Sequence, residues 1–178
     1  MADRIKKMCN LALAEFAGVN GSLKPLPPPS VWHSMASAAR ARKYEASPCA
    51  FFHLGIDAHV VGDMTSPPLG VGDLLIVSAG PGDFATIEAL MNIARTVGAK
   101  TAVVTARISS NLARHADVAL HIPAQTIAND QAGKLSVLPM GSLFEASLML
   151  VFELVILRLR DRLGKTPESI RARHTNLE

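Results

Sequence analysis

An unbroken apolar run followed at once by a glycine-rich turn is the feature that most constrains the fold of this chain. Residues 74–77 read Leu-Leu-Ile-Val, and residues 78–83 read Ser-Ala-Gly-Pro-Gly-Asp. A short run without polar residues is typical of a parallel strand that is covered on both faces. Asp83 is a good N-cap for a following helix. The pattern predicts a buried parallel strand that leads through a turn into a helix.

The same alternation continues along the chain. We expect further strands at 59–61, 101–105 and 118–122. Helices are expected after Asp83, at 111–116, at 141–163 and after Thr166. The first of these places five apolar side chains on one face and ends at Gly98; the five are Ile87, Leu90, Met91, Ala94 and Val97. Strands that alternate with helices predict an α/β fold, a three-layer sandwich in which helices flank a parallel sheet.

The first part of the chain has a different character. Residues 2–17 predict a helix, and the proline-rich stretch 25–30 predicts a linker. A chain of 178 residues is long enough for one domain with a real core. We therefore expect an N-terminal helix and linker over 1–30 and a single domain over 31–178.

The most hydrophobic segment, 143–159, indicates an interface. Glu145 and Glu153 interrupt it, so it is too short and too charged to span a bilayer. A helix that is apolar on nearly all sides is expected in a core or between subunits. We predict a homo-oligomer, a dimer or a tetramer, and no association with a membrane.

Composition excludes several other partners. The net charge of +3 comes from scattered residues, with no basic stripe and interleaved aromatics of the kind that binds nucleic acid. Cys9 and Cys49 fit neither a metal site nor a disulfide framework, which indicates free thiols in a reducing compartment and a cytoplasmic protein. No phosphate-binding or dinucleotide-binding motif and no metal-ligand spacing is present, so no cofactor and no metal are expected.

The loops after the predicted strands are the expected binding site. Ligands of parallel sheets bind beyond the carboxyl ends of the strands, here 78–83 and 105–110. Both loops are rich in small residues and hydroxyls, and backbone N–H groups at helix N-termini can hold a phosphate.

Four segments carry a resemblance to a known family: GDLLIVSAGPGD at 72–83, TAVVTARISSNLARHADVALHIPA at 101–124, LPMGSLFE at 138–145 and RHTNLE at 173–178. They resemble the sugar isomerase (SIS) family, in its 6-phospho-3-hexuloisomerase branch, and the turn and the IPAQT segment are most similar to plant relatives. The resemblance implies a five-stranded parallel sheet between helices, often in a tetramer. It also implies a phosphosugar isomerase of aldose–ketose or keto–keto type, which interconverts 3-hexulose 6-phosphate and fructose 6-phosphate.

The resemblance also implies roles for individual residues. Glu145 takes the place of the catalytic carboxylate, and isomerisation through an enediol needs such a base. His174 takes the place of a histidine that reaches an active site, its own or a neighbour's. The expected substrate-binding residues are Ala79, Gly80, Gly82, Asp83, Thr105, Ser109, Ser110 and Arg173.

Each role has a simpler alternative. In this alternative, Glu145 merely supplies negative charge at a helix N-terminus, and Ser109 and Ser110 merely cap a helix. The turn at 79–83 lacks two hydroxyls of the family pattern, and Pro81 has no N–H. A phosphosugar-binding module without turnover is therefore the second hypothesis, and an oligomerisation domain is the third.

Residues 31–50 depart from the family. The first strand of the family ends in a glycine-rich loop that this chain lacks, and residues 31–50 are alanine- and arginine-rich with weak periodicity. Loss of the family's first strand together with its loop is therefore one interpretation of this segment. Read one nucleotide upstream, the codons from Ser34 to Ala41 can encode YGVGREG, and those from Ala46 to Ala50 can encode LAMR. Five codons separate the two pieces, which is the family spacing. We therefore expect 31–50 to be frame-shifted relative to its relatives.

Overall fold

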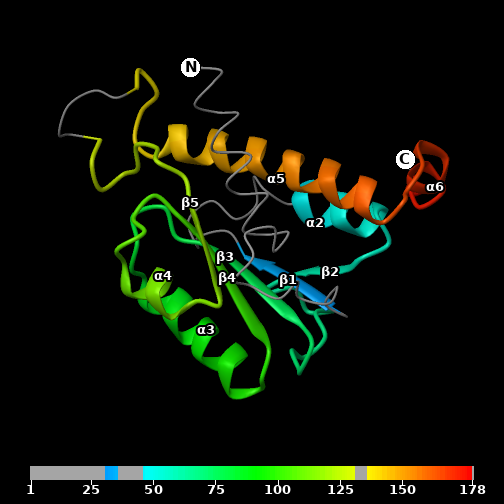
Figure 1. The fold of residues 1–178 in the computed structure, drawn as a ribbon, viewed down its shortest axis with the longest axis horizontal. Coiled ribbons are helices and arrows are strands. Elements are labelled where there is room, and N and C mark those ends of the chain that lie inside the picture. The colour runs from blue at the N-terminus through cyan, green and yellow to red at the C-terminus, as the bar shows by residue number, and fades with distance from the viewer. Residues whose placement is uncertain (1–30, 36–45, 131–135, 178) are drawn as a thin grey trace.

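The computed structural model describes residues 31–35, 46–130 and 136–177 (Figure 1). Its elements, in order, are β1 Val31–Met35, α2 Ala46–His53, β2 Asp57–Val60, β3 Leu74–Ser78, α3 Ala85–Thr96, β4 Lys100–Thr105, α4 Asn111–His115, β5 Val118–His121, α5 Ser142–Arg162 and α6 Pro167–Arg171. The helix predicted at 2–17 and the linker at 25–30 lie outside the described residues. The strands and helices predicted from residue 59 onward are confirmed to within about two residues.

The five strands form one parallel sheet in the order β2-β1-β3-β4-β5. The prediction of a five-stranded parallel sheet is thus confirmed. The order reverses between β1 and β3, because the chain first builds outward to β2 and then returns to the other side of β1. Sheets of this order bind ligands beyond the carboxyl ends of the strands at this switch point. The turn after β3 lies there.

The prediction that the first strand is lost is wrong. β1 is hydrogen-bonded between β2 and β3, with Trp32 in register with Ala58 on one side and with Leu74 on the other. The sequence Val-Trp-His-Ser-Met has no apolar run, which is why its composition did not indicate a buried strand. Backbone hydrogen bonds to β2 and to β3 hold this segment as a strand, although its side-chain pattern does not indicate one. The predicted loss of the following loop concerns residues 36–45, which lie outside the described residues.

Two apolar cores, one on each face of the sheet, make the three predicted layers. Side chains of β3 alternate between them, as a strand requires. Leu74 and Ile76 pack in the core that α2 and α5 cover, while Leu75 and Val77 pack in the core that α3 and α4 cover. Figure 1 shows the same arrangement, with α5 and α2 on one side of the strands and α3 and α4 on the other.

Helix α5 buries only one of its faces. Phe144, Leu148 and Phe152 are among the side chains that it packs on the sheet, and Phe152 meets Phe51 of α2 edge to face. The opposite face exposes Met149, Leu150 and Leu157 to solvent. The apolar character of 143–159 is therefore only half explained by the core of one chain. None of the described helices is long and apolar enough to cross a membrane.

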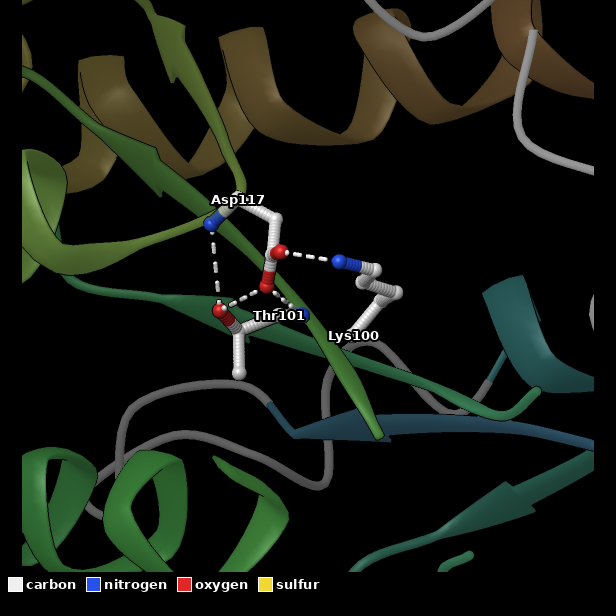
Figure 2. A network of polar contacts seen from close by, with 3 residues as sticks. All are labelled: Lys100, Thr101 and Asp117. Atoms are coloured by element: carbon white, nitrogen blue, oxygen red, sulfur yellow. Dashed lines mark hydrogen bonds and ion pairs between the residues drawn. The ribbon is translucent and has the colours of Figure 1, made fainter. Parts of the chain in front are cut away.

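A polar network fastens the amino end of β4 to the turn before β5 (Figure 2). Asp117 accepts hydrogen bonds from Lys100 Nζ at 2.8 Å, from the Thr101 N–H at 2.9 Å and from the Thr101 hydroxyl at 3.0 Å. Partial burial by itself would raise the pKa of the Asp117 carboxyl, but these hydrogen bonds and the Lys100 charge outweigh it, so the pKa lies below its ordinary value. The network lies at the amino edge of the sheet, opposite the predicted binding edge.

Candidate functional site

The two predicted binding loops are fastened to each other by Thr105. Its hydroxyl donates to the carbonyl of Ala79 at 2.7 Å and accepts from the N–H of Arg107 at 3.0 Å. The Ala106 N–H also donates to the Gly80 carbonyl at 3.0 Å. Because Thr105 is completely buried and its hydroxyl is occupied, its geometry supports a brace between the loops rather than a contact with a ligand.

Asp83 and Ser110 both serve the short helix α4. Ser110 is its N-cap, and its hydroxyl accepts from the N–H of Ala113 at 3.2 Å. Asp83 accepts from the N–H of Leu112 at 3.0 Å. The prediction that Asp83 caps the helix following it is wrong, because Phe84 occupies the N-cap position of α3 without any side-chain cap. Asp83 instead ties the turn after β3 to the loop after β4, while Ser109 stays exposed.

Gly80 brings the start of α5 against the turn. A Cβ at this glycine would lie 2.8 Å from Cδ1 of Phe144, closer than real Cβ contacts come. The buried Phe144 ring therefore packs directly on the Gly80 backbone. Glu145 is the next residue and lies half-buried in the first turn of α5. The structure thus brings the predicted carboxylate to the edge that carries the 79–83 turn.

Gln125 is a residue of this edge that the sequence reasoning missed. It follows β5, is only 2 % exposed, and its backbone carbonyl accepts from the Phe144 N–H at 3.3 Å. Its side-chain Nε2 donates to the carbonyl of Met140 at 3.4 Å, and Met140 has a left-handed φ of 54°. Oε1 of Gln125 is buried without a partner among the described residues. A lone glutamine in a polar loop gives no sequence signal, because its contacts depend on the return of α5.

The C-terminal motif lies elsewhere. The His174 ring stacks on His53 at the end of α2, with centroids 5.2 Å apart. Arg173 donates from Nε to the Phe52 carbonyl at 2.9 Å, and its guanidinium lies over the Phe52 ring. The last turn of α5 and the C-terminus lie at the same end of the molecule in Figure 1, far from the start of α5. The chain therefore does not bring Arg173 and His174 to its own Glu145.

The described residues contain no group of three or more His, Cys, Asp or Glu side chains that could hold a metal ion. Cys49 is a free, exposed thiol, and its Sγ lies 3.8 Å from His53 Nε2. His121 bonds the carbonyl of Ala106 through Nε2 at 3.1 Å. These histidines therefore have contacts within the fold that explain their positions.

The sheet order, the two helical layers and the loops at the carboxyl edge define a doubly wound α/β protein with a binding edge at the switch point of its sheet. Within this class, residues 48–150 match the model of the SIS domain. The chain belongs to the SIS domain family.

Individual relatives support the same grouping. The chain is 32% identical over 126 residues to a protein of Bacillus subtilis (strain 168) named 3-hexulose-6-phosphate isomerase, a match that covers 71% of this chain and 68% of that protein. A hypothetical protein from Methanococcus jannaschii superposes with a TM-score of 0.76 at 19% identity, over 99% of this chain and 98% of that chain. Its molecular function was inferred from its crystal structure as 3-hexulose-6-phosphate isomerase. The Vibrio vulnificus NanR protein, solved in complex with ManNAc-6P, superposes with a TM-score of 0.61 at 13% identity, over 96% of this chain and 68% of that chain.

Proposed function

We propose that this protein is a phosphosugar isomerase that interconverts 3-hexulose 6-phosphate and fructose 6-phosphate. The observation that carries the proposal is the position of Glu145, which the packing of Phe144 on Gly80 brings to the carboxyl edge of the sheet. The relatives named 3-hexulose-6-phosphate isomerase support the reaction, and the structural relative in complex with ManNAc-6P supports a phosphosugar as the ligand.

The chemistry requires one base that moves a proton between neighbouring carbons. Glu145 removes the proton from C2 of the 3-keto sugar, and the electron pair of that C–H bond forms the double bond of a 2,3-enediol as the C3 oxygen takes a proton from solvent. The C2 hydroxyl then gives one proton back to solvent and becomes the ketone, while the electron pair of the double bond takes the proton of the Glu145 carboxyl group onto C3. Atoms and electrons balance without a cofactor. General acid–base catalysis of this kind contributes about 10²–10⁴ in rate.

Replacement of Glu145 tests the proposal. Glu145→Gln keeps the shape of the side chain and removes the base, so we expect conversion of fructose 6-phosphate to fall by about 10²–10⁴. Binding of fructose 6-phosphate, measured by calorimetry, should stay within about two-fold, because a neutral amide still fills the site. Glu153→Gln is the matched control, since Glu153 is an exposed carboxylate two turns further along the same helix.

Conversion and binding, measured together, test the isomerase activity and the role of Glu145 separately. The chain lacks the family's first loop, so we expect the parent to convert the sugar weakly or not at all, and Glu145→Gln is therefore also compared in the version that carries the shifted reading of residues 34–50. If that version binds fructose 6-phosphate and never converts it, the isomerase proposal fails. If Glu145→Gln converts the sugar as fast as its parent, the role of Glu145 is wrong even though the protein is an isomerase.

The position of His174 extends the proposal to a second copy of the chain. His174 and Arg173 pack on α2 at the end of the molecule opposite Glu145, so one chain alone cannot combine them. We propose that these two residues complete the site of a neighbouring copy in a dimer or tetramer. The exposed apolar face of α5 supports such an assembly.

A binding module without turnover is the second candidate function. The turn after β3 favours it, because Ala79 and Pro81 offer no hydroxyl and Pro81 no N–H. The N–H groups of Ala79 and Gly82 are also occupied, by the carbonyls of Val104 and Ala79. A version of the chain that carries the shifted reading of residues 34–50 separates the candidates, since a restored loop should restore conversion only if the rest of the site is catalytic.

The remaining parts of the proposal concern the setting of the protein. We propose that residues 31–178 act as one SIS domain, with 1–30 as an extension in front of it. The free thiol of Cys49 agrees with a reducing compartment, and we propose the cytoplasm.

A further inference from the structure

We propose that Arg107 binds the phosphate group of the sugar and takes over the part of the missing hydroxyls in the turn after β3. This inference rests on the proposed function, because it names the residue that holds the phosphate in the same site. The resemblance assigned no role to Arg107.

The Arg107 side chain packs directly on Gly82, the second glycine of the turn. A Cβ added at Gly82 would be 3.0 Å from Cδ of Arg107 and 3.5 Å from its Cβ, so the stem of the arginine packs on the Gly82 backbone. Gly82 itself has a φ of +112°, in the region that favours glycine. The turn therefore has both the conformation and the free space that let the Arg107 side chain lie across it.

The backbone of Arg107 is held in place. Its N–H donates to the Thr105 hydroxyl, which also holds the carbonyl of Ala79. Thr105 thus fixes the arginine relative to the turn. The guanidinium is exposed and has no hydrogen bond or ion pair among the described residues, so its five donors remain available.

The charges of the described residues at this edge favour Arg107 as the partner of an anion. Parallel strands place the segments that follow β3, β4 and β5 at one edge, and the described residues of these segments are 79–84, 106–110, 122–130 and 136–141. Arg107 is the only Arg or Lys among them. Asp83 and Glu145 contribute negative charge at the same edge, while a phosphate monoester carries about −1.5 to −2. Among the described residues of this edge, Arg107 is therefore the cation that can meet the phosphate.

Two kinds of hydrogen-bond donor are available to a phosphate here, the first backbone N–H groups of α3 and the guanidinium of Arg107. The first N–H groups of α3 follow the turn, and Phe84 gives them no side-chain cap. Arginine matches phosphate through two parallel N–H donors, which lysine cannot reproduce. We therefore expect Arg107→Lys to restore only part of what Arg107→Gln loses.

The test measures binding of fructose 6-phosphate, fructose and inorganic phosphate by calorimetry. Arg107→Gln should weaken the binding of fructose 6-phosphate by about 10- to 100-fold, since hydrogen bonds to charged groups contribute about 1.5–3 kcal/mol. The affinity of Arg107→Lys for fructose 6-phosphate should lie between that of the parent and that of Arg107→Gln. Added salt should weaken binding by the parent more than by Arg107→Gln. Inorganic phosphate should compete with the sugar in the parent and lose that competition in Arg107→Gln, while fructose binds both proteins equally weakly.

The matched control is Arg114→Gln. Arg114 is an exposed arginine of α4 that already bonds the side chain of Asn111, so its loss should leave the affinity for fructose 6-phosphate unchanged. Thermal unfolding of each variant shows whether it is folded. Equal affinity of Arg107→Gln and the parent overturns the role of Arg107 and leaves the isomerase proposal intact. Binding that depends on Arg107, with no conversion even by the version that carries the shifted reading of residues 34–50, overturns the isomerase proposal and supports the phosphate site. A parent protein that binds neither fructose 6-phosphate nor inorganic phosphate overturns both proposals.

Discussion

Gly80 shows how a single missing side chain can position a site. Phe144 occupies the space in which any other residue would carry its Cβ, at 2.8 to 3.2 Å from three ring atoms. Gly80→Ala must therefore move a ring that is 5 % exposed and packed in the core. We expect a loss of about 1–3 kcal/mol in the free energy of unfolding, as overpacked cores show. Urea unfolding measures it.

Two further variants make this prediction specific. Gly70→Ala is the control, because the nearest atom to its added Cβ is Asp73 Oδ2 at an ordinary 3.7 Å. Its free energy of unfolding should change by less than about 0.5 kcal/mol. Gly80→Ala combined with Phe144→Leu should cost less than the sum of the two single changes, since a smaller side chain relieves the contact. Strict additivity would contradict the proposed clash.

Residues with distant partners are the ones whose roles could not be predicted from the sequence. Glu145 could be placed, because a run of recognisable residues surrounds it at a helix start. Asp83 could not, because its partner is the N–H of Leu112, 29 residues away, while its neighbours suggested a local cap. Gln125 and Arg107 gave no signal at all. Their importance comes from what the fold brings beside them.

At the scale of elements, Asp117 ties β4 to β5 at the edge away from the site. The pKa of Asp117 is lowered in the folded chain, so the unfolded chain binds its proton more readily. The stabilisation is therefore complete above the ordinary carboxyl pKa of about 4 and is lost as pH falls through the lower pKa of the folded state.

Asp117→Asn should accordingly lower the free energy of unfolding by about 1–2 kcal/mol at pH 7, because the carboxylate accepts from a cation and from two Thr101 donors. Near pH 2 the difference from the parent should shrink. Urea unfolding at both pH values checks this. Asp161→Asn is the control, since Asp161 is an exposed partner of the adjacent Arg160 and should change little at either pH. A difference that is the same at both pH values would rule out the ionised carboxylate as its cause.

Elements were predictable where local pattern and final environment agree. The apolar runs of β3 and β4 are buried on both faces, and their sequences alone indicate this. β1 was missed because its backbone pairing with β2 and β3 comes from the sheet, whereas its residues alternate without a clear pattern. Helix α5 is the opposite case, because its sequence indicated more burial than the single chain provides.

For the whole molecule, that excess apolar surface on α5 predicts a partner. A second copy of the chain, packed with its α5 antiparallel across a two-fold axis, would cover Met149, Leu150 and Leu157 with the same residues. The acidic start of each helix, at Glu145, would then approach the basic end of the other, at Arg158 and Arg162. α5 is about 30 Å long by its 1.5 Å rise per residue, so this pairing carries the C-terminal tail of one copy toward the site of the other.

Met149→Glu tests this arrangement. A charge in the middle of the covered face should dissociate the assembly at micromolar concentration, because burial of an unpaired carboxylate is costly. Ile93→Glu is the matched control, since Ile93 lies on α3 beyond the other face of the sheet and is exposed to the same extent, 56%. Light scattering should show a dimer or tetramer for the parent and for Ile93→Glu, and a monomer for Met149→Glu. If His174 completes a neighbouring site, Met149→Glu should also lose conversion of fructose 6-phosphate while Ile93→Glu keeps it. A parent that is monomeric yet active would contradict the assembly and would show that Glu145 works without His174.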